Sequence, residues 1–568
     1  MVLSPDVVVV GAGGDGPALA WRLGSLGHEV LLLEAGPWHG NEQWPDPHEA
    51  PGGTRSSDPE DLSGELLDEQ LPGLENDANN TATGRLRFGP ADRSQGSWGR
   101  QSEGELKITQ VAGVGGSTLH YYGNHPRATV PSVNDSEHWP IDYGDLVDYY
   151  RLIEEKFAFG PGATSTKEAA FYRAAEAAGY ELNDQLNVTA EQLPSYRPTP
   201  SLIDPPDEKL GGAYDGPFRY PEIEGDTLAN DDFQGGYAPR GAPVRERARK
   251  SANVSWVPEA LDTGNVTIQP NTFVTNVRTS GGEATGVDFR NTWSGETGRV
   301  DAEVVVLAAG AIETPRLWLN SGLPEREWLG KGLTHHWFDA VHGVFDPDAI
   351  EALAGEDELK PHVGQTWAGR VEAEEGIIGL VGNTPGLHGV LTGSSRAGLA
   401  ADNDTWGRPW DSVGRLTGSD LKEFMGDYRR TMTLLLSVDD EPRKENGVEL
   451  DPLMSDANGQ QAKVTWEPSL SDRYKRDSLA WTAAELLDEA GADHIHRSDL
   501  EPNLIHIHGT MAMGKVVDSG CESRDVDRLF VGDHSVIPNA LGGQNPTHTG
   551  QALAIRTADR IVDRYLST

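Results

Sequence analysis

Two histidines, His506 and His508, stand two positions apart in the stretch HIHGTMAMG at 506–514. A neutral imidazole can take a proton near neutral pH, and it is also a common metal ligand. If the stretch is extended, both rings lie on one face of the chain. A metal pair lacks a third ligand at suitable spacing, so we expect no metal site here. The nine residues do not show which imidazole acts, or on what.

A strand–helix–strand pattern begins the chain, DVVVVGAGGDGPALAWRLGSLGHEVLLLEAG at 6–36. Residues 7–10 and 30–33 are short apolar runs, which are typical of buried parallel strands. Residues 17–26 are expected to form the helix between them, which Gly27 ends. The segment therefore predicts a βαβ unit.

Three glycines in the turn after the first strand give the pattern GxGxxG: Gly11, Gly13 and Gly16. They allow a pyrophosphate to approach the helix N-terminus, and Glu34 after the second strand can accept from ribose hydroxyls. The alternative is an ordinary glycine turn in an α/β unit. Asp15 is expected to point outward, because a carboxylate beside a pyrophosphate is unfavourable. The pattern does not choose between NAD and FAD, but its place at the start of a long chain favours a flavoprotein.

A second glycine-rich stretch, VAGVGGSTLHYYGNHPR, covers 111–127. Gly115 and Gly116 let backbone lie against a flat ligand, Ser117 offers a small donor, and His120 follows. The alternative is a glycine-rich loop that leads into a strand.

Strand patterns return at 265–277, NVTIQPNTFVTNV, and at 285–290. Residues 301–322, DAEVVVLAAGAIETPRLWLNSG, then give a second buried strand, a glycine turn and a helix. This unit is expected beside the first sheet, with plain α/β packing as the alternative. We count Val274 and Gly310 among the candidate cofactor contacts.

Acidic residues dominate the composition, with 89 Asp and Glu against 47 Lys and Arg and a formal net charge of −42. Nucleic acid and anionic membrane surfaces are unfavourable partners, because both would be repelled. The acids are spread along the whole chain and not gathered in a tail. We therefore predict a halophilic protein from a salt-rich cytoplasm, where molar salt screens charges beyond about 3 Å and a carboxylate-rich surface stays hydrated.

Cysteine use and the start of the chain bear on location. The single cysteine, Cys521, can form no intramolecular disulfide and no iron–sulfur or cysteine-type zinc site by itself. We expect no transmembrane segment, and the start MVLSPDVVVVGAGG has no basic region or cleavage site. A cytoplasmic location is the expectation. Export with a signal-bearing partner, such as a small accessory subunit, is the alternative.

Five blocks follow one another along the chain: GAGGDG with Glu34, VGGSTLHYYGNHPR, LAAGAIETPRLWLNSG, HIHGTMAMG and VGDHSVIPNALGGQNPTHT. LGKGLTHHW at 329–337, with His336, accompanies them. In this order they resemble the glucose–methanol–choline (GMC) oxidoreductases, FAD enzymes that oxidise alcohols and sugars. The resemblance spans the chain and implies an FAD cofactor and oxidation of a CH–OH group.

The resemblance also implies roles for two site residues. HIHGTMAMG corresponds to the family's His-x-x-Gly-Thr, whose histidine is the active-site base, so the base would be His506. The family's partner, a His or Asn before Pro, maps to Asn545, which can hold the substrate oxygen. A hydroxyl proton would go to the imidazole and the carbinol hydride to the flavin. His508 is then expected to orient the base or line the pocket.

Four further positions take expected roles from the same match. Pro546 and Thr547 would start a helix running to about residue 566, with its positive end toward the flavin. Asp533 is expected near the ribityl chain or the pyrophosphate. His548, on that helix, is expected to pack.

Within the family, LEAGPW at 33–38, GGSTLH and QNPTHTGQALAIRTADRI are most similar to the branch of gluconate 2-dehydrogenase flavoprotein subunits and pyranose oxidases. The cysteine segments of some of those dehydrogenases are absent, which argues against an iron–sulfur relay. In the pyranose-oxidase-like pattern, a histidine at the place of His120 bonds covalently to the flavin methyl group. A non-covalent histidine that lines the ring is the alternative.

The expected fold class is α/β, with an FAD-binding Rossmann-like domain and a discontinuous substrate domain of mainly antiparallel sheet plus helices. Helices are expected at 137–159 and 470–491. The predicted domains are FAD-binding at 1–130, with a lid or excursion at 49–100, at 241–325 and at 501–568, and substrate-binding at 131–240 and 326–500.

Two other functions stay open beside oxidation of an alcohol, polyol, sugar or sugar acid. A lyase-type family member would bind FAD without net redox turnover, and bleaching of the flavin by an alcohol would separate it. A nicotinamide-dependent dehydrogenase would not be yellow when purified. The sequence names neither the substrate nor the acceptor, which could be oxygen, a quinone or a cytochrome.

Overall fold

The computed structural model describes residues 4–36, 97–101, 107–202, 251–395 and 407–567, apart from isolated positions within these ranges. The predicted excursion at 49–100 lies outside the described residues, except for 97–100.

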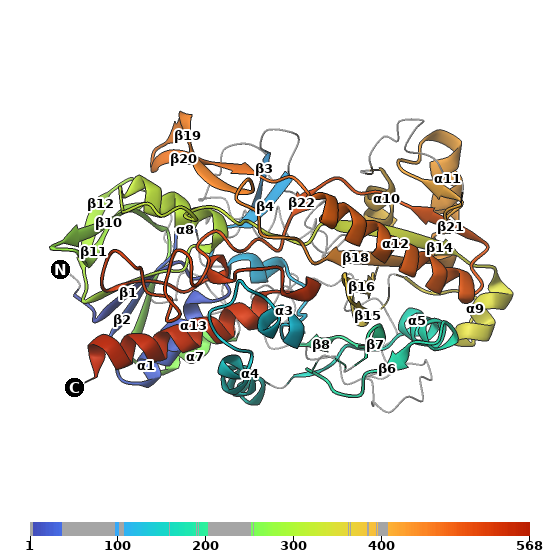
Figure 1. Ribbon diagram of the computed structural model, residues 1–568, viewed down its shortest axis with the longest axis horizontal. Helices are drawn as coiled ribbons and strands as arrows, with labels where there is room; N and C mark the ends of the chain where they lie inside the picture. Colours follow the sequence, from blue (N-terminus) through green and yellow to red (C-terminus); the bar gives the residue numbers. More distant parts are fainter. Residues whose placement is uncertain are drawn as a thin grey trace.

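A parallel five-stranded sheet lies at the end of the molecule that holds the N-terminus (Figure 1). Its strands, in spatial order, are β23 (Leu529–Val531), β13 (Val304–Leu307), β1 (Val7–Val10), β2 (Val30–Leu33) and β9 (Val266–Gln269). β23, β13, β1 and β2 are unbroken apolar runs because both of their faces are covered, whereas β9, at the edge, alternates buried with more exposed residues. The prediction that the second strand–glycine–helix unit lies beside the first is confirmed, since β13 pairs with β1.

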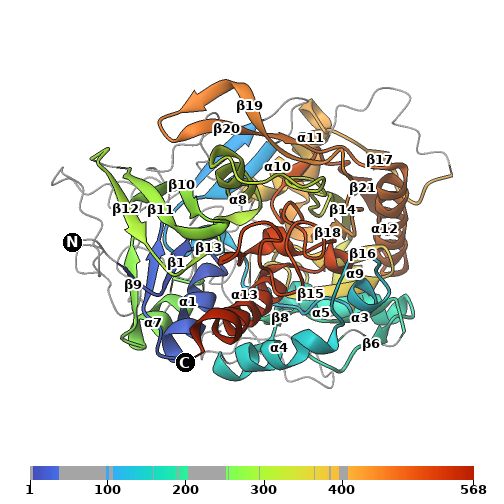
Figure 2. The same cartoon turned by 60° about the vertical axis from the view of Figure 1, so that its left-hand side comes forward.

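Helices cover one face of this sheet and a small antiparallel sheet covers the other (Figures 1 and 2). The helices are α1 (Gly16–Ser25), α7 (Trp256–Asp262) and α13 (Thr547–Ile561), which continues as a π-helical turn, η9, to Leu566. The small sheet consists of β10 (Thr272–Ser280), β11 (Glu283–Asn291) and β12 (Thr297–Asp301). The helix after β13 is α8 (Gly310–Asn320).

An eight-stranded, mainly antiparallel sheet forms the other half of the molecule. Its order is β17 (Ser412–Val413), β21 (His494–Arg497), β14 (Phe338–Val344), β18 (Thr431–Val438), β16 (Gly376–Leu380), β15 (Gly369–Ala373), β7 (Ser195–Pro198) and β6 (Glu181–Leu182). The helix α12 (Leu470–Glu489) packs on it through buried leucines and alanines. The predicted α/β class, with one parallel and one mainly antiparallel sheet, is confirmed.

The remaining elements link and flank the two sheets. The hairpin of β19 and β20 projects from the molecule (Figure 1). The bounds are β3 (Ser97–Gln101), β4 (Lys107–Val111), η4 (Gly116–His120), α3 (Val130–Asn134), α4 (Gly144–Lys156), β5 (Gly160–Pro161), α5 (Thr166–Ala177), β8 (Pro200–Ser201), α9 (Pro347–Ala354), α10 (Pro385–Gly393), α11 (Gly418–Gly426), η6 (Tyr428–Arg430), β19 (Gly447–Asp456), β20 (Gly459–Thr465), β22 (Asn503–Leu504), η7 (His534–Val536) and η8 (Leu541–Gly543). Every helix among the described residues is too short or too polar to span a bilayer.

Two predicted elements differ from the structure. The helix expected over 137–159 begins only at Gly144, and residues 137–143 form turns instead. The strand expected over 265–277 is two strands, β9 and β10, that belong to different sheets. The chain turns between them at Asn271, whose φ of +53° is possible because asparagine tolerates the left-handed region.

Candidate active site

His506 and Asn545, 39 positions apart, meet at the N-terminal end of α13. His506 follows β22, and Asn545 stands just before the first turn of α13. The Asn545 Nδ2 atom lies 3.3 Å from His506 Nε2. His506 is half-buried and Asn545 is buried. The structure thus places an imidazole nitrogen and a side-chain amide where both can face one bound oxygen atom.

A third histidine fixes which nitrogen of His506 is free. His336 Nε2 lies 3.1 Å from the carbonyl oxygen of Ala540, so this nitrogen must carry the proton and donate. Burial lowers the pKa of His336 well below its usual value, so the ring is neutral and its Nδ1 can only accept. His506 Nδ1 lies 2.8 Å from that Nδ1 and therefore donates. This leaves a lone pair on His506 Nε2, toward Asn545.

The pKa of His506 is lowered to about 3, first by burial and then by the neighbouring histidines and Arg370. The imidazole is therefore neutral, and able to accept a proton, well below pH 6.5. It is also a weak base in the resting site. A proton on it is stabilised only while negative charge develops nearby.

His508 makes a different set of contacts. Its ring is fully buried, and its Nδ1 lies 2.8 Å from the carbonyl oxygen of His506. Its backbone forms two 3.0 Å hydrogen bonds with Thr334, the second residue before His336. His508 therefore holds the loop of His506 against the segment of His336.

Arg370 and Gln544 extend the contacts of Asn545, and the sequence did not reveal them. Arg370 Nη2 donates to Asn545 Oδ1 over 3.2 Å, and Nη1 donates to Gln544 Oε1 over 2.5 Å. Arg370 and Glu372 alternate with valine in the strand GRVEA, a pattern that normally indicates a solvent-facing side. In this structure both are fully or nearly fully buried. The adjacency of Gln544 to Asn545 is the only sequence signal that pointed to this group.

The glycine turn after β1 is shaped by close packing at two of its three positions. A Cβ at Gly11 would lie 2.3 Å from the Ala308 carbonyl oxygen, and one at Gly16 would lie 2.0 Å from the Gly11 oxygen. A Cβ at Gly13 would meet no atom of the described residues within 4 Å. Gly11 and Gly16 thus permit the turn itself, whereas Gly13 leaves open space at the start of α1.

Glu34 braces this turn in the structure. Its carboxylate accepts hydrogen bonds from Ala12 N at 2.8 Å, Gly36 N at 2.8 Å and Gly113 N at 3.1 Å. Burial raises the pKa of Glu34 to about 7, against the effect of these donors. Glu34 therefore positions both glycine-rich loops, and its expected contact with ribose stays a prediction.

The second glycine-rich loop lies against the first. Gly115 N donates to the Ala12 oxygen over 2.7 Å, and a Cβ at Gly116 would lie 2.6 Å from the Gly13 Cα. Ser117 is exposed. His120 ends η4, and its side chain lies outside the described part of the chain.

The other candidate cofactor contacts surround the same turn. Asp533 accepts from Gly310 N at 2.9 Å and from the Thr314 hydroxyl at 2.6 Å, which ties η7 to the start of α8. Val274 is buried in β10. Pro546 caps α13 and Thr547 begins it, as the sequence predicts.

The prediction that Asp15 points outward is wrong. Asp15 is 4% exposed, and its Oδ2 lies 3.2 Å from His534 Nε2. The carboxylate turns inward because an imidazole lies there. Although burial opposes it, Asp15 raises the pKa of His534. A carboxylate paired in this way repels a pyrophosphate less than a free one.

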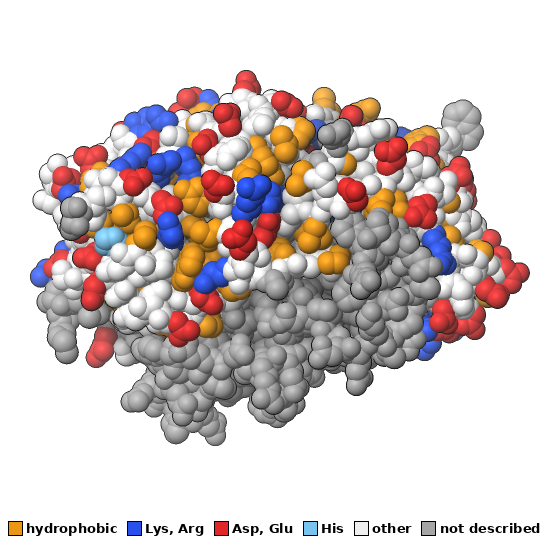
Figure 3. All heavy atoms as spheres, turned by 90° about the horizontal axis from the view of Figure 1, so that it is seen from below, with side chains coloured by type: hydrophobic (Ala, Val, Ile, Leu, Met, Phe, Trp, Pro, Cys, Tyr) orange, Lys and Arg blue, Asp and Glu red, His pale blue; other side chains and the backbone are white. Residues whose placement is uncertain are grey.

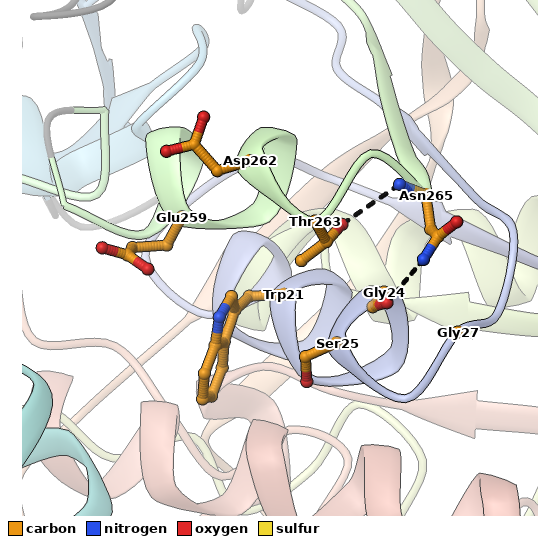
Figure 4. A pocket seen from close by; sticks show the side chains of 8 residues that line it. All are labelled: Trp21, Gly24, Ser25, Gly27, Glu259, Asp262, Thr263 and Asn265. Atoms are coloured by element: carbon orange, nitrogen blue, oxygen red, sulfur yellow. Dashed lines mark hydrogen bonds between the residues drawn. The ribbon is translucent and has the colours of Figure 1, made fainter.

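A separate pocket lies at the other end of α1 from the glycine turn (Figure 4). Its volume is about 350 Å³, and Gly24, Ser25, Thr263 and Asn265 are among the residues that line it. None of the candidate site residues lines this pocket. Among the described residues, no group of three or more His, Cys, Asp or Glu is arranged to hold a metal ion.

The residues around the glycine turn fit a dinucleotide cofactor. The open approach at Gly13, the amides at the start of α1 and the second loop behind them form a cradle for a pyrophosphate and the groups attached to it. His506 and Asn545 lie at the N-terminal end of α13, and α13 packs against α1. The arrangement connects a nucleotide site to a proton acceptor.

Comparison with known proteins agrees with this arrangement. The chain matches the family described as GMC oxidoreductase over 218–338, by its N-terminal model, and over 442–554, by its C-terminal model. It is 25% identical over 594 residues to 2-methyl-1,2-propanediol dehydrogenase of Mycolicibacterium austroafricanum, covering 99% of this chain and 95% of that one. It is 26% identical to C-glycoside 3-oxidase of Arthrobacter globiformis, over 66% of this chain and 71% of that one. The fold is similar to the crystal structure of pyridoxine 4-oxidase from Mesorbium loti, with a TM-score of 0.60, 15% identity and 99% of each chain covered.

Proposed function

Because the chain belongs to the GMC oxidoreductase family and is an FAD-dependent oxidoreductase of CH–OH groups, we propose that His506 is its catalytic base and that Asn545 holds the reacting oxygen. The observation that carries this proposal is the lone pair on His506 Nε2, left by the hydrogen-bond chain through His336 to Ala540. That nitrogen lies beside the Asn545 amide, which donates a hydrogen bond.

The two side chains have different roles toward the alcohol. The substrate hydroxyl donates its proton to His506 Nε2, while Asn545 Nδ2–H donates to the same oxygen and stabilises the charge that develops on it. When bound, FAD supplies the isoalloxazine ring that accepts the carbinol hydride. The positive end of α13, beside Asn545, favours the negative charge that this transfer produces.

The residues that we propose to hold the cofactor come from segments far apart in the sequence. We propose contacts from Gly11, Gly13, Gly16 and Glu34 on the nucleotide side, from Gly115, Gly116, Ser117, Val274 and Gly310 around it, and from Asp533, Pro546 and Thr547 near the flavin. The strands of the parallel sheet come from 1–130, 241–325 and 501–568, and those of the eight-stranded sheet from 131–240 and 326–500. This division supports the predicted domain boundaries.

The substrate proposal begins with small diols. The relative that spans this chain almost completely is named for 2-methyl-1,2-propanediol, and another is named for C-glycosides. We therefore propose a neutral alcohol, polyol or sugar-like substrate. Membership of the gluconate 2-dehydrogenase and pyranose oxidase branch, a salt-rich cytoplasm and a small accessory subunit are proposed from the sequence alone.

The test is anaerobic mixing of the purified yellow protein with 2-methyl-1,2-propanediol, polyols, aldonates and glycosides in high salt. At least one of them should bleach the flavin absorbance. A yellow protein that no alcohol bleaches would favour the lyase-type alternative, and a colourless protein that cannot be reconstituted with FAD would contradict the cofactor assignment.

Acid precipitation separates the two roles open to His120. Yellow colour in the pellet means a covalent bond to the flavin. Yellow colour in the supernatant means a non-covalent contact.

A further inference from the structure

A buried charge network lies directly behind Asn545. Arg370 and Glu372 are on β15, and Arg197 lies opposite Arg370 on β7. All three side chains are at most 2% exposed. Arg197 Nη2 and Gln544 Nε2 both donate to Glu372 Oε1, at 2.5 and 3.1 Å. Arg370 completes the network through its contacts with Gln544 and Asn545.

The network carries an excess of one positive charge. It holds two guanidinium groups and one carboxylate, so its net charge is +1. Burial lowers the pKa of Arg370 to about 9, and the group stays charged at neutral pH. Among the described residues, Arg370 Nε and Glu372 Oε2 have no hydrogen-bond partner.

Other acidic groups near the site do not cancel this charge. Asp440, beside His335, is fully buried, and this burial raises its pKa well above the usual value, which disfavours its charged form. Asp439 faces Lys475 at 3.6 Å. His335, His336, His506 and His508 are neutral because burial lowers their pKa values, and His534, whose pKa is raised, faces the Asp15 carboxylate at 3.2 Å. The reacting oxygen at Asn545 therefore lies in a positive field.

Arg370 also sets the orientation of the Asn545 amide. A guanidinium nitrogen can only donate, so the Asn545 atom that faces Arg370 must be the oxygen. The NH₂ group then faces His506 and the substrate oxygen. Without Arg370, both orientations of the amide become available, and one of them presents a second acceptor to a hydroxyl that needs a donor.

We propose that Arg370 is a positioning and specificity-determining residue, which directs the Asn545 amide toward the reacting oxygen and makes the site select neutral or anionic alcohols over cationic ones. This inference rests on the proposed function of the His506 and Asn545 pair. It adds the charge class of the substrate and a residue that acts through Asn545. A cationic alcohol is disfavoured in two ways. Its charge is repelled by Arg370 on binding, and it reduces the stabilisation that Arg370 gives to the developing alkoxide.

Two alcohols of nearly equal shape test the charge selection. Choline is a cation, and 3,3-dimethyl-1-butanol is its neutral counterpart. Each is measured by anaerobic flavin reduction and as a competitive inhibitor of the alcohol that reduces the wild-type flavin fastest. The wild-type holoenzyme should favour the neutral compound by about 10- to 100-fold, the size of one charge interaction across several ångströms of protein.

Three variants assign the selection to Arg370. Arg370→Met should shrink the neutral-to-cation ratio to within a few-fold of one. Glu372→Gln, which keeps the shape and removes the negative charge, should increase the ratio by about tenfold. Arg497→Met is the matched control, because Arg497 is a buried arginine of the same eight-stranded sheet that pairs with Asp339 instead. It should leave the ratio unchanged even if the melting temperature falls.

A double-mutant cycle tests the positioning role. Arg370→Met should slow reduction by the neutral alcohol in the wild-type background and much less in the Asn545→Ala background, because its effect passes through the amide. Equal binding of the two alcohols by wild-type protein, binding of neither, an unchanged ratio in Arg370→Met, or rate losses that multiply fully would overturn the inference. Wild-type flavin that no alcohol at all reduces would instead overturn the proposed function.

Discussion

The neutrality of His506 makes a prediction about pH. Its pKa is lowered to about 3 by burial and by its neighbours, so the base form is present throughout the neutral range. The rate constant of flavin reduction should therefore stay nearly constant from about pH 8 down to about pH 5.5. Stopped-flow reduction at saturating alcohol measures it. An acid limb with its midpoint at or above the ordinary histidine pKa of 6.5 would show that the resting imidazole is not held neutral.

The sequence predicted only some of the residues that make up the candidate site. The glycine pattern and the HIHGTMAMG stretch have short spacings, so the residues that act together are close along the chain. Arg370 reaches Asn545 across 175 positions, and its strand pattern indicated solvent. Asp15 was misjudged for a similar reason, because the imidazole that attracts it comes from η7, 519 positions along the chain. Contacts of this kind exist only once the sheets have assembled.

At the scale of elements, the turn between β1 and α1 gives a matched pair of substitutions. Gly16→Ala forces a Cβ to within 2.0 Å of the Gly11 oxygen and should lower the stability of the apoprotein by about 1–3 kcal/mol. In the part of the chain that the structure describes, the methyl group of Gly13→Ala meets no atom within 4 Å, so this change should leave apoprotein stability unchanged. It should still weaken FAD binding by about tenfold or more, since the methyl group occupies the approach to the pyrophosphate.

Melting temperatures of the two apoproteins and titration with FAD measure these effects. The open approach at Gly13 would not be the cofactor site if Gly13→Ala bound FAD as tightly as the wild-type protein does.

Element boundaries were predictable where the pattern is strongest. The buried β-branched runs and the α12 helix match the expected ranges within a few residues, because apolar period and capping agree there. Pro270 and Asn271 interrupt the strand pattern at 265–277 and mark the turn, but nothing local shows that β9 and β10 enter different sheets. The two strands differ in the strands with which they pair, and the strand propensity of their residues does not reveal this difference.

For the molecule as a whole, the net charge of −42 predicts a dependence on salt. Acidic side chains are spread over the face shown in Figure 3, so their repulsion acts across the surface and is screened by ions. The melting temperature should rise between about 0.1 and about 3 M KCl. Thermal scans of the holoenzyme across that range measure it, and a flat response would contradict a salt-adapted surface.

Acid should destabilise the fold through its buried histidines. Their lowered pKa values mean that the folded state excludes protons which the unfolded state binds below pH 6.5. Each such histidine therefore lowers the free energy of unfolding by about 1.4 kcal/mol per pH unit as the pH falls from 6.5 toward the pKa of that histidine in the folded state. This set includes His125, His335, His336, His342, His388, His496, His506, His508 and His548.

Among the described residues, His534 and four buried carboxyl groups have raised pKa values and act in the opposite direction, since the folded state binds their protons more tightly. The carboxyl groups are Glu34, Asp439, Asp440 and Asp533. The histidines with lowered pKa values outnumber these groups, so the denaturation midpoint in urea should fall clearly between about pH 7 and about pH 5. A midpoint that rises over this interval would contradict the buried, neutral state of the histidines.

The most direct measurement is the anaerobic flavin-reduction rate of His506→Ala beside that of His508→Ala. Loss of the base should slow reduction by roughly 10²–10⁴ while FAD content stays near that of the wild type, because the glycine turn is untouched. His508 bonds the loop and not the reacting oxygen, so His508→Ala should stay within about tenfold of the wild-type rate. A collapse of the rate in His508→Ala, with His506→Ala still active, would show that the other imidazole of HIHGTMAMG is the base.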